Sequence, residues 1–69
     1  MQNEHLMISL AAARVNAGLT QDDVASRLHV GKQTVVNWEQ GKSEPKVSQG
    51  KQLSELYNMP LDNIIFLPK

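Results

Sequence analysis

Two short amphipathic segments joined by a turn of about three residues constrain the fold of this chain more than any other feature. Val24 and Leu28 lie about one helical turn apart in the first segment, and so do Val35 and Trp38 in the second. This spacing predicts two helices that each bury one face. Because the turn, residues 29–31, is too short to separate the helices widely, we expect them to pack against each other.

The ends of these two helices carry their own signals. Thr20 is followed three residues later by Asp23, which resembles a capping box with aspartate in place of glutamate. The first helix is therefore predicted to begin at about residue 20. The second is predicted from about Lys32 to Gln40, where Gly41 stops it.

A further helix is predicted before this pair. Leu6, Leu10, Ala13 and Ala17 recur at the spacing of one helical face. Gly18 follows them in the position where a left-handed backbone ends many helices. These residues predict an N-terminal helix that reaches back to about Leu6.

Two more helices are predicted after the pair. One covers about residues 47–57 and ends at Asn58, and Pro60 suits the first position of a last short helix over about residues 60–65. No alternation of apolar and polar residues is long enough to predict a strand. The predicted fold is all-α, a compact bundle of about five short helices in a single domain, residues 1–69.

Composition argues against several classes of protein. The 69 residues include no cysteine, so neither a disulfide nor a thiolate-bound zinc ion can stabilise so small a core. His5 and His29 have no further ligands at metal spacing, and no nucleophile–base constellation is present. We therefore expect no enzyme, no metal, no cofactor and no small-molecule substrate.

The apolar run over residues 6–13 superficially resembles a targeting signal. The five residues before it contain no lysine or arginine, and removing the run would remove a predicted core helix. No run approaches the length that spans a membrane. The expectation is a soluble, cytoplasmic protein without a membrane partner.

The formal net charge is zero, which counts against a nucleic-acid-binding protein. The charges are unevenly distributed, however. Residues 24–51 carry an excess of three positive charges, whereas residues 1–23 and 52–69 are both net negative. The positive excess therefore coincides with the second helix of the central pair and the loop that follows it.

The whole pattern resembles the Cro and phage-repressor type of helix-turn-helix family, also called XRE-like or lambda-repressor-like. The resemblance covers about residues 6–66 and implies a helix-turn-helix at about residues 20–40. It is carried by Arg14, Gly18, Leu19, Thr20, Gln21, Val24, Ala25, Leu28, Val30, Thr34, Val35, Trp38, Glu39, Gly41, Pro45, Leu53, Leu56, Asp62 and Ile64.

The resemblance also implies roles for individual residues. The second helix of the central pair, about residues 32–40, would lie in the DNA major groove. Its base-reading side chains would be Lys32, Gln33, Val36 and Asn37. Residues that would hold phosphates and set the register are Gln21, Lys42, Ser43 and Lys46. Arg14 and Glu39 would form a structural ion pair between the predicted N-terminal helix and the end of the reading helix.

Three residues depart from the family pattern. His29 replaces the usual glycine of the turn, although histidine tolerates positive φ better than most residues. Gly50 stands where a core leucine is common, and Ser54 where alanine is common. Glycine inside a helix costs up to about 1 kcal/mol. Either the fourth helix starts late, or another group packs closely against Gly50.

The apolar tail Ile64, Ile65, Phe66 and Leu67 has two interpretations. Four consecutive apolar residues cannot all point into one small core from a terminal helix. One interpretation is a core plug followed by a frayed end. The other, which we favour, is a contact between two copies of the chain, because related phage regulators bind palindromic sites as dimers.

Together these features predict a sequence-specific, Cro-like or repressor-like transcriptional regulator. It would bind double-stranded DNA at a palindromic operator, as a homodimer, with helix 32–40 in the major groove. Two alternatives remain. One is an antitoxin-like regulator with a toxin partner, and the other is a protein-interaction adaptor that keeps the fold without reading DNA.

Overall fold

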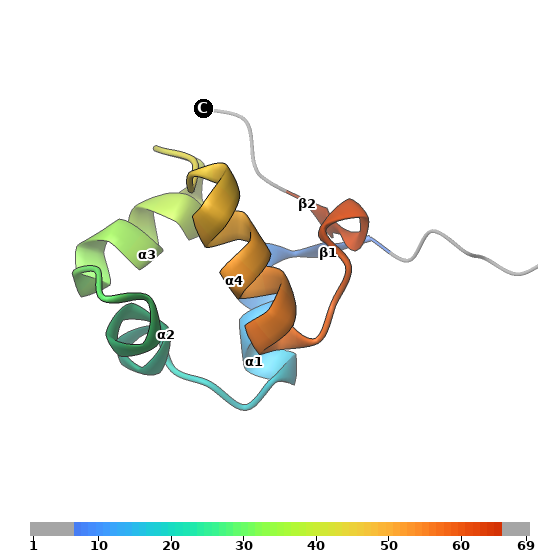
Figure 1. Cartoon of the computed structure of the whole chain (residues 1–69), viewed down its shortest axis with the longest axis horizontal. Coiled ribbons are helices and arrows are strands. Elements are labelled where there is room, and N and C mark those ends of the chain that lie inside the picture. The colour runs from blue at the N-terminus through green and yellow to red at the C-terminus, as the bar shows by residue number, and fades with distance from the viewer. Residues whose placement is uncertain (1–6, 66–69) are drawn as a thin grey trace, which may run out of the picture.

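The computed structural model describes residues 7–65, apart from the side chain of Ile65. Four helices form most of it: α1 (Leu10–Asn16), α2 (Gln21–Leu28), α3 (Lys32–Gln40) and α4 (Val47–Tyr57). Two short strands, β1 (Ile8–Ser9) and β2 (Ile64–Ile65), and a three-residue 3-10 helix η1 (Leu61–Asn63) complete it. Helices α2 and α3 lie on one side of α1 and α4, and the strands lie on the other (Figure 1). The predicted helical bundle is confirmed.

The first helix begins later than predicted. The Ser9 hydroxyl accepts a hydrogen bond from the Ala12 amide at 3.1 Å and caps α1 at Leu10. Residues 8 and 9 are a strand, so the expected extension of this helix back to Leu6 is wrong for them, and Leu6 itself lies outside the described residues. Gly18 follows the helix with φ +75°, as its predicted role as a stop requires.

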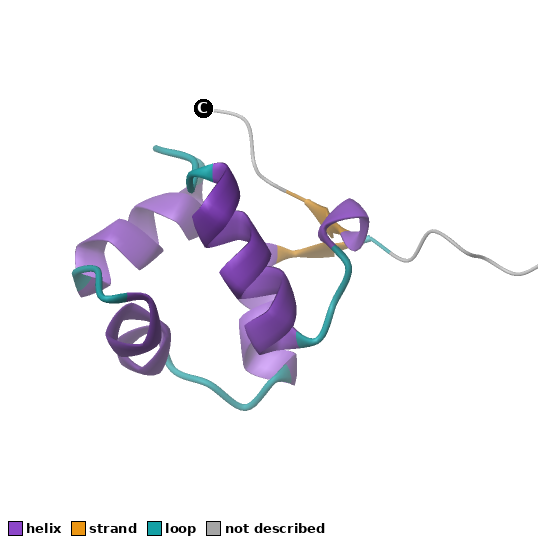
Figure 2. Ribbon diagram, in the orientation of Figure 1, coloured by secondary structure: helices purple, strands orange, loops and turns teal. Residues whose placement is uncertain are grey.

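The two strands were not predicted, and they replace part of the expected last helix. Only a three-residue turn of 3-10 helix follows Pro60, and the chain then extends into β2. Strand β2 pairs with β1 in parallel, with Ile8 opposite Ile64 (Figure 2). Two residues are too few to show a period of two, so the sequence pattern could not reveal this pairing.

The helix-turn-helix pair forms as the sequence predicts. The capping box at the start of α2 is present, with Thr20 N donating to Asp23 Oδ2 at 2.8 Å and Asp23 N donating to Thr20 Oγ1 at 3.0 Å. His29 ends α2 with φ 58°, and Gly41 ends α3 with φ 77°. Both residues occupy the left-handed region. The turn between α2 and α3 therefore keeps its shape although His29 replaces the usual glycine.

The core is continuous across all four helices and reaches β2. Its buried residues are Leu10, Ala13, Val24, Ala25, Leu28, Val35, Trp38, Leu53, Tyr57 and Ile64. Each predicted helix of the central pair contributes the face that its spacing indicated. Because α3 buries Val35 and Trp38, its opposite face is turned to solvent.

Helix α4 accommodates both departures from the family pattern. It begins at Val47 and includes Gly50, so it does not start late. A methyl group on Gly50 would lie 3.6 Å from Leu61 Cδ2, so Leu61 occupies space that a larger side chain would need. The Ser54 hydroxyl donates to the Met59 carbonyl at 2.7 Å and ties the helix to the following chain.

Candidate nucleic-acid interface

The outward face of α3 presents the four residues expected to read bases. Lys32 and Gln33 are exposed at its first turn, and Val36 and Asn37 are half-buried one turn later. Val35 and Trp38 anchor the opposite side of the helix, with exposed fractions of 1% and 4%. The backbone of α3 is therefore fixed against the core while this strip remains accessible.

Two of these side chains are hydrogen-bonded to each other. Gln33 Nε2 donates to Asn37 Oδ1 at 3.0 Å, across one turn of the helix. Residues four apart lie on the same helical face, so the bond needs no distortion of the backbone. The bond favours one orientation of both amide groups on the accessible strip.

Lys32 has an acidic neighbour from α2. Its Nζ lies 3.9 Å from Asp22 Oδ2, and both side chains are exposed, with 58% and 75% of their surface accessible. Such an exposed pair is weak, worth about 0–1 kcal/mol at most. Lys32 therefore remains available to another partner, although Asp22 brings a negative charge to the edge of the strip.

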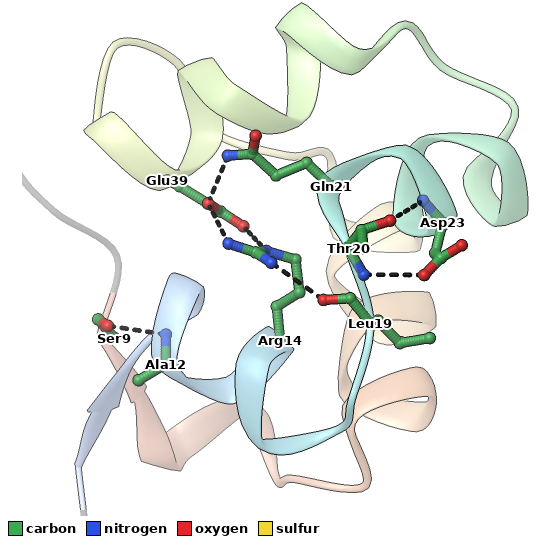
Figure 3. Close-up of polar contacts among 8 residues, drawn as sticks. All are labelled: Ser9, Ala12, Arg14, Leu19, Thr20, Gln21, Asp23 and Glu39. Carbon is green, nitrogen blue, oxygen red and sulfur yellow. Dashed lines mark hydrogen bonds and ion pairs between the residues drawn. The ribbon is translucent and has the colours of Figure 1, made fainter.

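Near the end of α3, a polar network joins helices α1, α2 and α3. Arg14 Nε donates to Glu39 Oε2 at 2.7 Å, and Arg14 Nη2 donates to Glu39 Oε1 at 3.4 Å, so the expected ion pair is present. Arg14 Nη1 also donates to the Leu19 carbonyl at 3.0 Å, in the segment that leads into α2 (Figure 3). The hydrogen bond to Glu39 raises the pKa of Arg14.

Gln21 belongs to the same network. Its Nε2 donates to Glu39 Oε1 at 2.9 Å, so its side chain is directed to the end of α3 (Figure 3). Sequence reasoning placed Gln21 at the start of α2 as a phosphate ligand and did not foresee this bond. The position at the helix start is as expected, but the Gln21 amide has a protein partner within the described residues.

Tyr57 lies close enough to this network for the charges of Glu39 and Arg14 to act on its pKa, and its sequence context did not reveal this. Its side chain is buried, and its hydroxyl has no hydrogen-bond partner among residues 7–65. Burial, and to a smaller extent the charge of Glu39, raises the pKa of Tyr57 to about 12, although Arg14 opposes the shift. The tyrosine therefore remains neutral across the physiological range.

The loop after α3 places the other expected phosphate ligands. Lys42 and Lys46 are exposed, and Ser43 is half-buried. The Lys42 amide donates to the Asn37 carbonyl at 2.9 Å, and the Lys46 amide donates to Gln49 Oε1 at 2.8 Å. Both lysine backbones are thus held by neighbouring helices, while neither side chain forms an ion pair within the described part of the chain.

The dimer contact expected of the apolar tail, residues 64–67, cannot include the side chain of Ile64. Ile64 is only 4% exposed and lies in the core of the single chain, so its expected part in a dimer contact is wrong. Strand β2 brings it there by pairing with β1 rather than continuing a helix. Phe66 and Leu67 lie outside the described residues, as does the side chain of Ile65.

The described residues, 7–65, contain neither a candidate metal site nor a membrane-spanning helix. This region holds no group of three or more histidine or acidic side chains placed to bind a metal ion. None of its helices has the length and apolar character needed to cross a membrane.

Comparison with known proteins identifies one matching family. A sequence model of the helix-turn-helix family matches residues 10–64 of this chain, which include all four helices. No solved structure matches the chain at a significant level.

Three curated proteins are similar to the chain. The cryptic phage CTXphi transcriptional repressor RstR of Vibrio cholerae is 33% identical over 52 residues, 75% of this chain and 47% of that protein. The transcriptional regulator ImmR of Bacillus subtilis is 34% identical over 56 residues, 81% and 44% of the two chains. The transcriptional activator BcrR of Enterococcus faecalis is 29% identical over 56 residues, 81% and 28%. The chain spans less than half the length of each relative.

Proposed function

The chain belongs to the XRE-type helix-turn-helix family, and from this premise we propose that it is a transcriptional regulator that binds double-stranded DNA in a sequence-specific manner. In this proposal α3 enters the major groove. The three similar proteins are all named as transcriptional regulators, and the family match supports the expectation that the chain is not an enzyme.

The observation that carries the proposal is the outward strip of α3. Lys32, Gln33 and Asn37 offer hydrogen-bonding groups on one accessible face, and Val36 adds an apolar surface between them. Lysine donates to guanine, glutamine and asparagine pair with adenine, and an apolar side chain can contact the thymine methyl. A helix anchored by Val35 and Trp38 can hold these groups in a fixed register.

Contacts to phosphates would set that register. Lys42 and Lys46 extend from the loop that follows α3, and neither is neutralised by an acidic partner in the described residues. Ser43 and the start of α2 at Gln21 are the other expected anchors. Helix starts favour anions because their free amides and dipole point outward, although Asp22 and Asp23 oppose a phosphate at this helix.

The direct test is a selection of bound sequences from a random duplex pool, followed by titrations over a range of salt concentrations. We expect an enriched sequence and an affinity that falls as salt rises. Salt-dependent binding without an enriched sequence would contradict specific reading. Absence of any binding would favour the adaptor, and DNA binding together with capture of a toxin partner would favour the antitoxin-like regulator.

We further propose that two copies bind a palindromic site. Two reading helices would then lie about 34 Å apart, one turn of the duplex. Deletion of residues 66–69 is expected to weaken self-association, measured by sedimentation, much more than helicity, measured by circular dichroism. The deletion leaves Ile64 in place because that residue belongs to the core. A full-length chain that stays monomeric at high concentration, and selects no palindrome, would contradict the dimer.

A further inference from the structure

Gln33 and Asn37 touch each other on the face that would meet DNA. We propose that they read bases as one coupled unit, in which Asn37 orients the amide of Gln33. The inference rests on the proposed function and deepens it, because it specifies what the reading helix recognises. Asn37 is then a positioning residue for Gln33 as well as a reader in its own right.

The geometry of the pair defines which groups remain for DNA. Gln33 Nε2 donates to Asn37 Oδ1 at 3.0 Å, and residues four apart on a helix are stacked one above the other. A glutamine amide has two N–H donors and one carbonyl acceptor. After one donor is used by Asn37, Gln33 retains one N–H beside its carbonyl oxygen.

That remaining pair of groups matches adenine. Adenine presents the N7 acceptor and the N6 donor side by side in the major groove, whereas guanine presents two acceptors there. Because the bond to Asn37 favours one orientation of the Gln33 amide, it disfavours a rotation that would offer two donors to guanine. Gln33 is thus set for adenine in one orientation of the base pair.

Asn37, the other residue of the pair, is expected to prefer a different base from Gln33. Asn37 Oδ1 accepts the bond from Gln33, while both Nδ2 hydrogens are free of that bond. A side chain that presents mainly donors favours bases with acceptors in the major groove, and guanine offers two. The two neighbouring amides, although chemically alike, are therefore expected to prefer different bases.

Two variants of Asn37 separate coupled from independent reading. Asn37→Ala removes the acceptor that orients Gln33, and alanine favours the helix, so the fold should persist. Asn37→Asp keeps an acceptor for Gln33 Nε2 but removes the Nδ2 donors. Selections from random duplexes are compared for the wild type, both variants, Gln33→Ala, and Lys42→Ala as a control outside the pair. The base pair read by Gln33 is the one whose preference Gln33→Ala abolishes.

We expect Asn37→Ala to reduce the adenine preference at the Gln33 base pair by about twofold, because an exposed amide pair at this spacing is worth about 0.2–0.5 kcal/mol, although Gln33 is unchanged. Asn37→Asp should keep that preference, lose the preference at its own base pair and weaken binding to all sequences. Retention of the adenine preference in Asn37→Ala, or its loss in Asn37→Asp, would overturn the coupling. A wild-type chain that enriches no sequence would refute the proposed function instead, so the two failures are distinguishable.

Discussion

Glu39 is the residue on which most polar contacts between the helices depend. It accepts hydrogen bonds from Arg14 and Gln21, which lie on two other helices, and only 6% of its side chain is exposed. The Arg14 side chain is 15% exposed, so its charge is partly shielded from water. A buried charge without its partner is strongly destabilising, whereas exposed ion pairs contribute little.

Replacement of Glu39 by alanine is accordingly expected to lower the free energy of unfolding by about 1–3 kcal/mol, between the values for exposed and fully buried pairs. The variant leaves the Arg14 guanidinium and the Gln21 amide without their acceptor. Chemical denaturation measures the loss, and the double variant with Arg14→Ala should recover part of it because no unpaired charge remains. An unchanged denaturation midpoint for Glu39→Ala would show that the pair is not stabilising.

Tyr57 gives the chain a specific sensitivity to high pH. Its pKa rises from 10.0 to about 12 in the folded chain, so the folded state keeps a proton that the unfolded state loses between these values. Stability must therefore fall as pH rises through this window, by up to about 3 kcal/mol, and it is unaffected by this group below pH 10. Tyr57 is the one tyrosine of the chain, so absorbance reports its ionisation directly.

The matched variant is Tyr57→Phe, which keeps the ring and removes the titrating group. We expect it to eliminate the part of the alkaline loss that belongs to Tyr57. At neutral pH it should raise stability by about 1 kcal/mol, because the hydroxyl is buried without a partner in the described residues. Equal pH profiles for the two proteins would disprove the assigned role.

At the scale of elements, the helix-turn-helix is defined by its ends. The Thr20–Asp23 capping box begins α2, and its hydrogen bonds lower the pKa of Asp23. The cap should therefore weaken on acidification, once Asp23 becomes protonated. His29 and Gly41 end the two helices in left-handed conformations, but only glycine adopts that conformation without steric strain.

His29→Gly is thus expected to stabilise the domain by about 0.5–1 kcal/mol. Relief of left-handed strain should exceed the extra chain entropy that glycine gives to the unfolded state. Gly31→Ala is the control in the same turn, because Gly31 has φ −76° and open space around a new methyl group. Thermal unfolding of both variants measures the effect. A destabilised His29→Gly would mean that the histidine side chain contributes more than its backbone strain.

At the scale of the molecule, the arrangement of charge matters more than its sum. The net charge is zero, yet residues 24–51 have an excess of three positive charges on α3, its flanking loop and adjacent segments. Fields of this kind fall off within about 10 Å at moderate salt. A local positive surface can therefore attract phosphates even though the whole chain is neutral.

Variants of Lys42 and Gln33 should separate the two kinds of DNA contact, with Lys42 contacting phosphates and Gln33 reading a base. Lys42→Ala is expected to weaken binding to all duplexes alike and to lower the slope of affinity against salt by about one unit. Gln33→Ala should instead reduce affinity for the preferred site by about 1–3 kcal/mol and relax the preference at one base pair. Titrations on specific and scrambled duplexes distinguish them. Equal weakening of both duplexes by Gln33→Ala would mean that this residue does not read bases.

Local signals in the sequence determined the helical class, the central helix pair and the ends of its helices. Thr20, Gly41 and Asn58 act through bonds and backbone angles within a few residues, so their effects could be predicted without the fold. The apolar spacing likewise predicted which faces of α2 and α3 are buried, and the resemblance to the helix-turn-helix family is confirmed by the family match.

Apart from the Arg14–Glu39 pair, which the family resemblance implied, only the tertiary structure decided the contacts between segments far apart in the chain. The strand at Ile64 exists because Ile8 lies beside it, and the buried place of Ile64 follows from that pairing. The Gln21 bond to Glu39, the burial of Tyr57 without a partner and the packing of Leu61 over Gly50 have the same origin. Each depends on how separate elements pack, because distances across the core are fixed by all the side chains between them rather than by any local pattern.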